Sequence, residues 1–478
     1  MGKGTVETMI QFGTGGWRAI IGDEFIKQNV QLLTIAIAKT MKRDGIAERG
    51  IVIGYDRRFL SKEAAQWAAQ VMAAQEIPCL FINRQAPTPL VMFAVKRRKL
   101  PFGMAITASH NPAIYNGVKV FMKGGRDADE ALTEDLERMM ASLEPEDVRE
   151  LPLEEALASG AVQLIDPMNE YIDSIIGALD MEAIRERRLR IVLDPMYGVS
   201  KTALQTILLT ARCDVEVIHE RHDTLFGGRL PAPNHKTLAS LMTYVEEKHS
   251  DIGIATDGDA DRLGIVDDHA QFLHPNTILV LLYHYLLRYK GWRGCAVRNI
   301  ATTHLLDRIA EAYGEACYEV PVGFKYISSK MAETNAVIGG ESSGGLTVRG
   351  HIQGKDGIYA AALLVEMIAK TGKSLSALCE EIKEQYGSFE MTENDYRFSE
   401  AEKQRIADLL FKDKLLPEFP HKIERVSYLD GCKVYFQNGG WIITRFSGTE
   451  PLLRVFCEMP TLQEASQTSD LLAKFLSL

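Results

Sequence analysis

Residues 251–262 have the sequence DIGIATDGDADR. The apolar run Ile252–Ala255 is followed at once by a loop that carries Asp257, Asp259 and Asp261. Short apolar runs bounded by polar residues and glycine are typical of buried strands in α/β sheets. Loops that follow such strands are where α/β proteins place their functional sites. The stretch therefore predicts an α/β protein with a carboxylate-rich site at the end of a strand.

The same alternation of strand and helix extends in both directions from this stretch. Helical periodicity at Val30–Arg43 and Lys62–Ala74 alternates with apolar runs at Gly50–Tyr55, Cys79–Ile82 and Gly103–Ile106, which predicts an α/β layer. A solvated acidic stretch separates this layer from a second round of the pattern, and a third round follows. The acidic stretch is Asp127–Glu155; the later strands are expected at Leu189–Leu193, Cys213–Ile218, Asp251–Ala255, Gly294–Arg298 and Ala336–Ile338, and the later helices at Lys201–Leu209, Asn276–Tyr289 and Thr303–Tyr313.

The C-terminal part of the chain has a different rhythm. A charged helix at Ala401–Phe411 precedes β-like segments at Gly431–Phe436, Gly440–Arg445 and Leu452–Glu458, and a further helix ends the sequence. We therefore predict three similar α/β domains followed by a distinct C-terminal domain. Their expected boundaries are 1–160, 161–270, 271–383 and 384–478.

Length and charge exclude several classes of protein. At about 100–200 residues per domain, 478 residues are too many for one small binding module. The 54 basic and 64 acidic residues give a net charge of −10, which argues against nucleic acid or an anionic membrane as a partner. A small phosphorylated ligand stays possible, because it needs only a local group of basic side chains.

The cysteines and the apolar runs indicate a cytoplasmic protein. The seven cysteines are scattered, odd in number and never spaced as Cys-x-x-Cys, so we expect reduced thiols. The N-terminal sequence lacks the apolar core of a signal peptide, and the most apolar run, Thr277–Leu287, is too short for a membrane span. We expect no membrane association.

A serine is presented in the loop Thr107–Pro112. Ser109, flanked by His110 and Asn111 and closed by a proline, is a candidate nucleophile or phosphoryl carrier. Serine and asparagine are also common turn formers, so Ser109 as a turn cap, with His110 as an ordinary polar residue, is the alternative.

The three aspartates predict a metal site. Carboxylates at alternate positions can converge, and neighbouring like charges are stable when a cation neutralises them. Oxygen ligands favour Mg²⁺, and three protein ligands leave coordination positions for water and phosphate. A calcium-binding EF-hand is excluded because Arg262 stands at its obligatory glycine and a strand, not a helix, precedes the loop. An acidic surface turn is the remaining alternative.

Two further loops have the composition of ligand-binding segments. In Gly339–Gly345 the glycines allow close approach of a ligand, and Glu341 and Ser343 can bind hydroxyls. The loop Arg445–Pro451 combines a guanidinium, two hydroxyls and a glycine, which suits a phosphate. Ordinary turns are the alternative for both, although a turn does not account for Arg445.

In combination and in order, TASHNP, DGDADR, GGESSGG and RFSGTEP resemble the motifs of the α-D-phosphohexomutase superfamily, the phosphoglucomutases and phosphomannomutases. The resemblance covers nearly the whole chain. It implies three related α/β domains with mixed sheets and a C-terminal α+β domain similar to the TATA-binding-protein fold, arranged around a central cleft. Each domain would contribute one of the four loops.

The resemblance also implies a role for each motif residue. Ser109 would be phosphorylated in the active enzyme and would share one Mg²⁺ per active site with the three aspartates. Arg18, His110 and Arg262 would be donors around the transferring phosphoryl group, and Lys119 and Lys325 match positions proposed as general acid or base. The substrate-binding residues would be Glu341 and Ser343 for ring hydroxyls, and Arg445, Ser447, Gly448, Thr449 and Arg454 for the second phosphate.

The implied reaction interconverts hexose 1-phosphate and hexose 6-phosphate through a hexose 1,6-bisphosphate, which is both intermediate and activator. Gly323–Lys325, His351–Gly357 and Gly13–Ala19 are similar to the phosphoglucomutase side of the superfamily, and Gly345 stands where the bifunctional phosphomannomutase branch has a histidine. We expect glucose phosphates as substrates, with mannose phosphates as the alternative, and a monomer or homodimer. A phosphohydrolase and a non-catalytic sugar-phosphate binding protein are less favoured, because the first needs no second phosphate site and the second needs neither Ser109 nor the aspartates.

Overall fold

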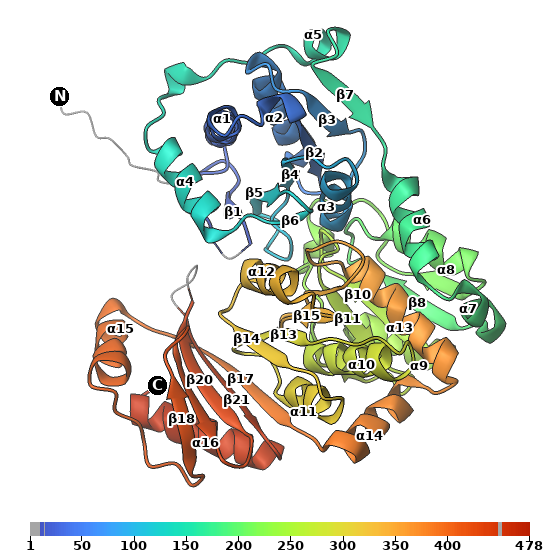
Figure 1. Cartoon of the computed structure of the whole chain (residues 1–478), viewed down its shortest axis with the longest axis vertical. Helices are drawn as coiled ribbons and strands as arrows, with labels where there is room; N and C mark the ends of the chain where they lie inside the picture. Colours follow the sequence, from blue (N-terminus) through green and yellow to red (C-terminus); the bar gives the residue numbers. More distant parts are fainter. Residues whose placement is uncertain (1–9, 14, 448–451) are drawn as a thin grey trace. The chain divides into compact units, whose positions relative to one another are not determined.

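The computed structural model describes residues 10–13, 15–447 and 452–478 (Figure 1). The chain divides into two compact units, which are described separately. Unit 1 consists of Met1–Ile278 and Ser343–Ser376, and unit 2 consists of Leu279–Ser342 and Ala377–Leu478. Among the described residues, no helix is both long and apolar enough to cross a membrane.

The first sheet of unit 1 is mixed. Its strands follow the order β1-β5-β4-β2-β3-β7, and β6 pairs with β5. The strands β7, β3, β2 and β4 are parallel, whereas β5 runs antiparallel to both β4 and β1. These strands are β1 (Trp17–Ile20), β2 (Ile51–Tyr55), β3 (Cys79–Ile82), β4 (Phe102–Ile106), β5 (Tyr115–Met122), β6 (Arg126–Asp127) and β7 (Val162–Ile165).

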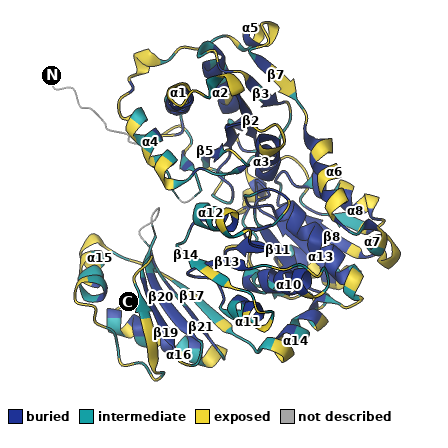
Figure 2. Cartoon of the chain, in the orientation of Figure 1, coloured by how far each residue is buried: buried dark blue, intermediate teal, exposed yellow. Residues whose placement is uncertain are grey.

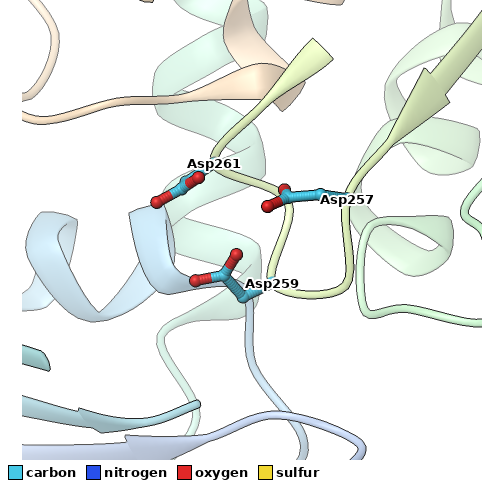
Figure 3. A group of neighbouring side chains, drawn as sticks. All are labelled: Asp257, Asp259 and Asp261. Atoms are coloured by element: carbon cyan, nitrogen blue, oxygen red, sulfur yellow. The ribbon is translucent and has the colours of Figure 1, made fainter. Parts of the chain in front are cut away.

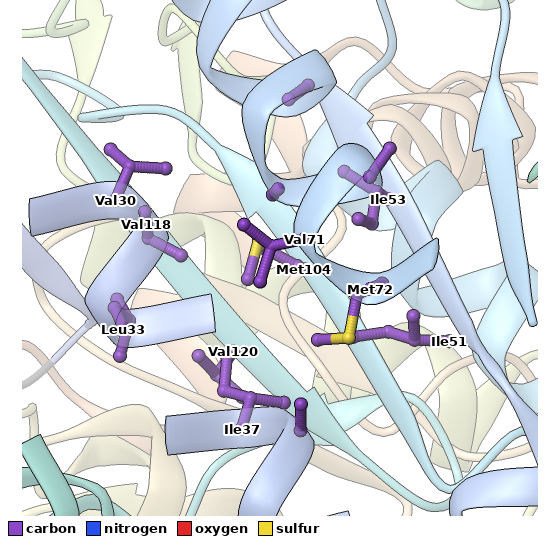
Figure 4. Close-up of a cluster of buried hydrophobic side chains, with 14 of the residues drawn as sticks. Val30, Leu33, Ile37, Ile51, Ile53, Val71, Met72, Met104, Val118 and Val120 are labelled. Carbon is purple, nitrogen blue, oxygen red and sulfur yellow. The ribbon is translucent and has the colours of Figure 1, made fainter. Parts of the chain in front are cut away.

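Helices supply the apolar side chains that cover this sheet (Figure 4). Val30, Leu33 and Ile37 come from α1 and lie one helical turn apart, and they join Ile51 and Ile53 of β2 in one buried cluster. A strand covered on both faces has a nearly continuous apolar sequence, as in the β2 sequence IVIGY. The helices of this part are α1 (Lys27–Arg43), α2 (Ser61–Ala74), α3 (Thr88–Arg97), α4 (Glu130–Met140), α5 (Leu153–Ala158) and α6 (Met168–Ala178).

The acidic stretch Asp127–Glu155 is solvated as predicted, since its residues are exposed or half-buried except at Ala128, Leu136 and Leu143. It contains α4, whose first turn is capped by the Asp129 carboxylate accepting from the Leu132 backbone N–H at 3.1 Å. Leu136 and Leu143 are buried against the first sheet's core, while the charged residues keep to the other face. What the sequence analysis did not predict is the helix itself, because the net acidity of the stretch obscures a few apolar residues with helical spacing.

The second sheet of unit 1 has the order β12-β11-β10-β8-β9. Strands β9, β8 and β10 are parallel, and β11 folds back antiparallel to β10, so the DGDADR loop joins two hydrogen-bonded neighbours. Helix α13 packs against α7 and α8 of the same unit. The strands of this sheet are β8 (Arg190–Asp194), β9 (Asp214–Val217), β10 (Ile252–Thr256), β11 (Leu263–Val266) and β12 (Phe272–Leu273), and the helices are α7 (Met181–Arg187), α8 (Lys201–Thr210), α9 (Ala239–Lys248) and α13 (Gly357–Thr371). The short strand β16 (Leu346–Val348) also lies in unit 1 but is not part of this sheet.

Unit 2 contains a parallel sheet β14-β13-β15 and an antiparallel sheet β17-β21-β20-β19-β18. Helix α16 packs on β17 and β21 of the antiparallel sheet, which is an α+β arrangement. The strands are β13 (Ala296–Asn299), β14 (Cys317–Val320), β15 (Ile338–Gly340), β17 (Glu390–Arg397), β18 (Ile423–Ser427), β19 (Cys432–Phe436), β20 (Trp441–Phe446) and β21 (Leu452–Met459); the helices are α10 (Pro275–Arg288), α11 (Leu305–Ala312), α12 (Phe324–Thr334), α14 (Leu375–Tyr386), α15 (Glu400–Ala407) and α16 (Leu462–Leu476). A π-helical turn at Asp408–Lys412 extends α15.

A group of buried charged and aromatic side chains connects the two sheets of unit 2. Lys433 on β19 is fully buried, and its Nζ donates to the Ile300 carbonyl at 2.6 Å and to Glu319 Oε2 at 2.8 Å. Glu319 also accepts from Arg298 Nη1 at 2.6 Å and from the Tyr435 hydroxyl. We call this group the lysine cluster; it consists of Arg298, His304, Asp307, Glu319, Lys433, Tyr435, Trp441 and Glu458.

Burial follows the layered arrangement (Figure 2). Every residue of β2, β4, β10, β13 and β19 is buried, whereas the surface helices bury few residues: Leu136 in α4, and Leu241 and Val245 in α9. Three α/β layers and a C-terminal α+β layer confirm the predicted fold class.

Candidate active site

The three aspartates of the metal loop converge (Figure 3). Asp257, Asp259 and Asp261 follow β10, and each offers a carboxylate oxygen to a group in which these atoms lie within 4.8 Å of one another. All three side chains are buried. An exposed acidic turn, the alternative from the sequence, does not describe this arrangement.

Two oxygens of this aspartate cluster have unmet bonding capacity. Within the described part of the chain, Asp259 Oδ1 and Asp261 Oδ1 are buried without a hydrogen-bond partner. A buried anionic oxygen without a partner is costly, and a divalent cation with a preference for oxygen ligands would satisfy it. The donor set therefore fits Mg²⁺ or a similar ion.

Two lysines lie against the same carboxylates. Lys119 Nζ, on β5, is 2.6 Å from Asp259 Oδ2 and 2.5 Å from Asp261 Oδ2, and Lys355 Nζ is 2.9 Å from Asp261 Oδ2. Burial favours the neutral amine, but the carboxylates outweigh it and raise the pKa of Lys119. For Asp261, burial is likewise outweighed by Lys119 and Lys355, which hold the pKa of the carboxyl well below its usual range.

Asp257 contacts the candidate nucleophile directly. Ser109 Oγ donates to Asp257 Oδ2 at 2.6 Å, and the Arg262 backbone N–H donates to Asp257 Oδ1 at 3.0 Å. Burial and the charges of Asp259 and Asp261 raise the pKa of Asp257 well above its usual value. The Ser109 hydroxyl is therefore hydrogen-bonded to a carboxyl whose ionised form is destabilised by burial and by neighbouring negative charge.

The backbone at Ser109 has a left-handed conformation, with φ of 53°. A serine is rarely found there, and such strain persists only where surrounding contacts impose it. The loop also meets Gly258 so closely that a Cβ on Gly258 would lie 2.7 Å from the Ser109 carbonyl oxygen. The glycine therefore permits the serine loop and the metal loop to pack together.

Two cationic or polar residues predicted near Ser109 lie in this cluster. His110 Nδ1 is 3.3 Å from Ser109 Oγ, and burial together with Arg262 and Arg18 lowers the pKa of His110 well below its usual value. Arg18 lies on β1, opposite Gly117 of β5, so the hydrogen bonds of the strand pair fix its backbone.

Unit 2 carries Glu341, one of the two residues predicted to bind the sugar, and the predicted phosphate-binding residues Arg445 and Arg454. Glu341 Oε1 accepts from Asn299 Nδ2 at 3.1 Å and from the Gly323 N–H at 3.2 Å, so the side chain is held at the start of α12. Lys325 lies in the first turn of that helix and is half-buried. Ser343, the other predicted hydroxyl-binding residue, is exposed and belongs to unit 1.

The candidate phosphate site includes an unusual pair of arginines. Arg445 is the penultimate residue of β20 and stands directly opposite Arg454 of β21 in the strand register. Arg445 Nε donates to Asp430 Oδ1 at 2.8 Å, and Asp430 Oδ2 accepts from the Val322 N–H at 2.8 Å. Arg454 Nε lies 3.8 Å from Asp395 Oδ1, so each arginine has a carboxylate neighbour that offsets the repulsion expected between like charges directly opposite in a sheet. The Ser447 N–H bonds the Leu452 carbonyl at 2.8 Å; the predicted ligands Gly448 and Thr449 lie outside the described residues.

Lys355 was not predicted as a site residue, although it lies in the segment His351–Gly357 that the sequence singled out. Lys355 is buried, and a Cβ on Gly345 would lie 2.3 Å from its Cδ, so Gly345 gives the lysine its path to Asp261. Asn299 and Asp430 were also not predicted as site residues, because their hydrogen-bond partners Glu341 and Val322 are distant in the sequence. For Lys355 the available signal was a lysine after a glycine in His351–Gly357, a segment that resembles the phosphoglucomutase side of the superfamily.

Three α/β layers and a C-terminal α+β layer, with a serine loop, a buried carboxylate loop and a paired-arginine strand, fit a phosphoryl-transfer protein of the phosphohexomutase type. Models of all four phosphoglucomutase/phosphomannomutase domains match the chain in order: alpha/beta/alpha domain I at residues 9–147, domain II at 169–270, domain III at 274–386 and the C-terminal domain at 397–474. The chain belongs to the phosphoglucomutase/phosphomannomutase family of the α-D-phosphohexomutase superfamily.

Individual relatives span the full chain. A phosphoglucomutase/phosphomannomutase of Thermococcus kodakarensis is 31% identical over 466 residues, covering 97% of this chain and 98% of the relative. A probable phosphoglucosamine mutase of Pyrococcus furiosus is 30% identical over 457 residues, covering 95% of each. The crystal structure of a putative phosphomannomutase from Thermus thermophilus has a TM-score of 0.85 at 29% identity and covers 98% of this chain and 99% of its own. The family confirms a mutase, and these names differ in the sugar.

Proposed function

We propose that the protein interconverts glucose 1-phosphate and glucose 6-phosphate through a phosphoserine at Ser109 and a glucose 1,6-bisphosphate intermediate. The observation that carries this proposal is the 2.6 Å hydrogen bond from Ser109 Oγ to Asp257, inside a buried cluster with unsatisfied carboxylate oxygens. A hydroxyl at such a position suits reversible attachment of a phosphoryl group.

The chain's own residues would divide the work as follows. In the forward direction the free sugar hydroxyl attacks phosphorus, the bond from phosphorus to Ser109 Oγ breaks, and the hydroxyl proton passes to a base. Arg18, His110 and Arg262 would stabilise the transferring group, and Asp257, Asp259 and Asp261 with Ser109 would hold one Mg²⁺, which when bound supplies positive charge opposite the phosphoryl oxygens.

Lys119 and Lys325 are the proposed proton-transfer groups. The carboxylate partners of Lys119 raise its pKa and hold the amine protonated, so Lys119 would exchange a proton with the sugar oxygen only when nearby cations lower that pKa. By microscopic reversibility, the group that accepts the proton when the hydroxyl attacks also returns it to the leaving sugar oxygen. Lys325, in the first turn of α12, is the alternative.

The second phosphate of the substrate would bind to the paired arginines. Arg445 and Arg454 are cross-strand neighbours of like charge, and a phosphate shared between them would further offset their repulsion. This pair argues against a phosphohydrolase, which has no need of a second phosphate site. Glu341 and Ser343 would bind ring hydroxyls, and Ser447, Gly448 and Thr449 would complete the phosphate site.

A coupled assay of glucose 6-phosphate formed from glucose 1-phosphate tests the proposal, with glucose 1,6-bisphosphate as activator. Ser109→Ala should lose activity, whereas Ser469→Ala, at a buried serine on α16, should keep it. Activity in Ser109→Ala would refute the phosphoserine, and release of inorganic phosphate without isomer would indicate a hydrolase. The same assay with mannose and glucosamine phosphates ranks the sugars by kcat/KM, since relatives carry all three names.

We also propose a cytoplasmic protein, because its seven cysteines form no disulfide. A monomer or homodimer and the domain boundaries 1–160, 161–270, 271–383 and 384–478 complete the proposal. Size-exclusion chromatography with light scattering and limited proteolysis test these two points.

A further inference from the structure

Arg58 is a buried arginine outside every motif that identifies the family. It follows β2 in the sequence Asp56-Arg57-Arg58, and its side chain has no exposed surface. Taking a guanidinium out of water is costly unless its donors are well paired. The contacts of Arg58 therefore indicate why the fold retains it.

The guanidinium binds four backbone carbonyls of the serine loop. Nη1 donates to the carbonyls of Pro112 at 2.9 Å and Tyr115 at 3.0 Å. Nη2 donates to the carbonyls of Ser109 at 2.7 Å and Asn111 at 2.6 Å. Each terminal nitrogen thus uses both of its protons, and one planar group spans the whole turn that presents the serine.

A second set of contacts fixes the loop from the same side. Asp56 Oδ2 lies 3.5 Å from Arg58 Nε and accepts from Thr107 Oγ1 at 2.7 Å. Thr107 Oγ1 in turn accepts from the Ser109 N–H at 2.9 Å. Asp56 Oδ1 accepts from the Arg58 N–H at 2.9 Å. The N–H and the carbonyl of Ser109 are therefore both held by the segment that follows β2.

These contacts determine where the serine hydroxyl lies. The left-handed backbone of Ser109 is unfavourable for a serine, so it requires bonds on either side of the residue. Arg58 and Thr107 supply those bonds, and the resulting conformation directs Oγ to Asp257. The ring of Phe226, 4.8 Å from the Arg58 guanidinium carbon, closes the other side of the cation.

We propose that Arg58 is a positioning residue for phosphoryl transfer: its guanidinium, seated on four carbonyls, holds Ser109 in the left-handed conformation that places Oγ at the aspartate cluster. The inference rests on the proposed function of Ser109. Arg58 does not contact the substrate in this role, so it should affect the rate of phosphoryl transfer and leave sugar affinity alone. A lysine cannot replace it, because one ammonium has three donors and no planar fork.

The test compares Arg58→Lys and Arg58→Met with Arg57→Met as the matched control. Arg57 also donates to two carbonyls, those of Tyr197 at 3.3 Å and Glu220 at 3.0 Å, but neither belongs to the serine loop. The protein is mixed with glucose 1,6-bisphosphate and Mg²⁺, and the phosphorylated fraction is followed by intact-protein mass spectrometry. Steady-state kcat and KM and the melting temperature are measured for each variant.

We expect both Arg58 variants to phosphorylate about 10²-fold more slowly than the unaltered protein, the loss associated with misplacement of a reacting atom by about 1 Å. The loss should fall on kcat, with KM for the hexose phosphate unchanged within about threefold, because no substrate contact is removed. Arg57→Met should keep the phosphorylation rate. Added guanidinium chloride at millimolar concentration should partly restore Arg58→Met.

The outcomes separate this inference from the proposed function. If the unaltered protein accepts no phosphoryl group, the proposed function and the inference both fail. If it accepts one and the folded Arg58 variants react as fast, only the inference fails. If neither Arg58 variant folds, Thr107→Val decides, because it removes only the hydroxyl that bonds the Ser109 N–H. A slower kcat at constant KM in that variant would support the positioning network, and unchanged kinetics would overturn it.

Discussion

Two groups of buried charges in this protein have opposite hydrogen-bonding states. In the aspartate cluster of unit 1, Asp259 Oδ1 and Asp261 Oδ1 lack partners among the described residues. In the lysine cluster of unit 2, as far as the chain is described, no buried side-chain nitrogen or oxygen of its members lacks one. Both groups contain charged side chains that are fully buried, such as Asp259 and Lys433, so burial alone does not distinguish a binding site from a structural network.

The lysine cluster shows what a saturated network looks like. Lys433 lies 4.2 Å from the Trp441 ring centre, and Trp441 Nε1 donates to Glu458 Oε1 at 2.9 Å. Arg298 makes two bonds to Asp307, at 2.7 and 3.0 Å. Such a network holds two sheets together and offers nothing to a ligand. The aspartate cluster, in contrast, keeps bonding capacity that folding leaves unused, and this is the property of a site.

The largest effect that would test the comparison is expected at the aspartate cluster. Asp257→Asn keeps the shape of the side chain but removes a charge that burial and two neighbouring carboxylates oppose. We expect turnover to fall by about 10³-fold or more, since several kcal/mol of metal-dependent stabilisation is removed. The melting temperature without Mg²⁺ should not fall, and added Mg²⁺ should no longer raise it.

Asp268→Asn is the control for this change. Asp268 follows the same hairpin but accepts from the Ser376 N–H at 2.9 Å and hydroxyl at 2.7 Å, so it is a structural carboxylate. Its loss should lower stability and leave the Mg²⁺ response intact. A Mg²⁺-dependent rise in melting temperature in Asp257→Asn would show that the cluster does not bind the cation.

The second largest effect is expected in the lysine cluster, where a substitution should lower the stability of the protein and leave its activity nearly unchanged. Glu319→Gln leaves Arg298 and Lys433 buried without the carboxylate that both contact. Removing one partner of a buried ion pair costs about 3–5 kcal/mol, so the unfolding transition of unit 2 in urea should shift to lower denaturant concentration. The activity of the protein that stays folded should change little.

Glu311→Gln, at an exposed position on α11, provides the comparison for Glu319→Gln and should unfold as the unaltered protein does. Equal urea midpoints for the two variants would contradict a stabilising role for the lysine cluster.

The third effect concerns pH. Burial, followed by the charge of Arg298, lowers the pKa of Lys433 to about 7, whereas an unfolded lysine titrates near 10.5. Between these values the unfolded chain binds more protons, so stability should rise with pH, by at most about 1.4 kcal/mol per pH unit. Below pH 7 the lysine is charged in both states and the slope disappears.

Urea unfolding of the unaltered protein and of Lys433→Met at intervals from pH 6 to pH 9 measures how much Lys433 contributes to the pH dependence of stability. The difference between their unfolding free energies should grow with pH above 7, since only the lysine contributes the slope. A difference independent of pH would mean that Lys433 keeps an ordinary pKa when folded.

The smallest effect is expected at Trp441. Trp441→Phe removes the hydrogen bond to Glu458 and weakens the contact of the ring with Lys433. Together these interactions contribute about 1–2 kcal/mol, so the decrease in unfolding free energy should be smaller than that of Glu319→Gln. A larger decrease would place the aromatic ring, and not the carboxylate, at the centre of the network.

Local sequence predicted the strands well, because a buried parallel strand has a recognisable apolar run. The prediction at Cys79–Ile82 coincides with β3, and that at Gly50–Tyr55 differs from β2 by one residue. Elements whose pattern is weak were missed: β5 was not predicted as a strand, although it carries Lys119. Helix α4 was hidden by its charge. The boundaries of such elements depend on partners that a local pattern does not contain.

The motif loops were found from sequence, but the links between them were not. Asp257, Asp259 and Asp261 were predicted to converge and do so, because they share one short loop. The approach of Lys119 and Lys355 to that loop joins residues far from it in the sequence, and no spacing rule predicts it. The same is true of Arg58 and Ser109, which are far apart in the sequence and meet because β2 and β4 are neighbours.

The sequence by itself determined the fold class, the family and the four loops that carry the chemistry. It could do so because strands, turns and ligand-binding loops depend on the order of neighbouring residues. Only the tertiary structure decided which charges are satisfied. Among the described residues, two aspartate oxygens have no hydrogen-bond partner, whereas the Lys433 ammonium donates to the Ile300 carbonyl and to Glu319. The reason is that the energy of a buried charge depends on what surrounds it in space, and those surroundings come from distant parts of the chain.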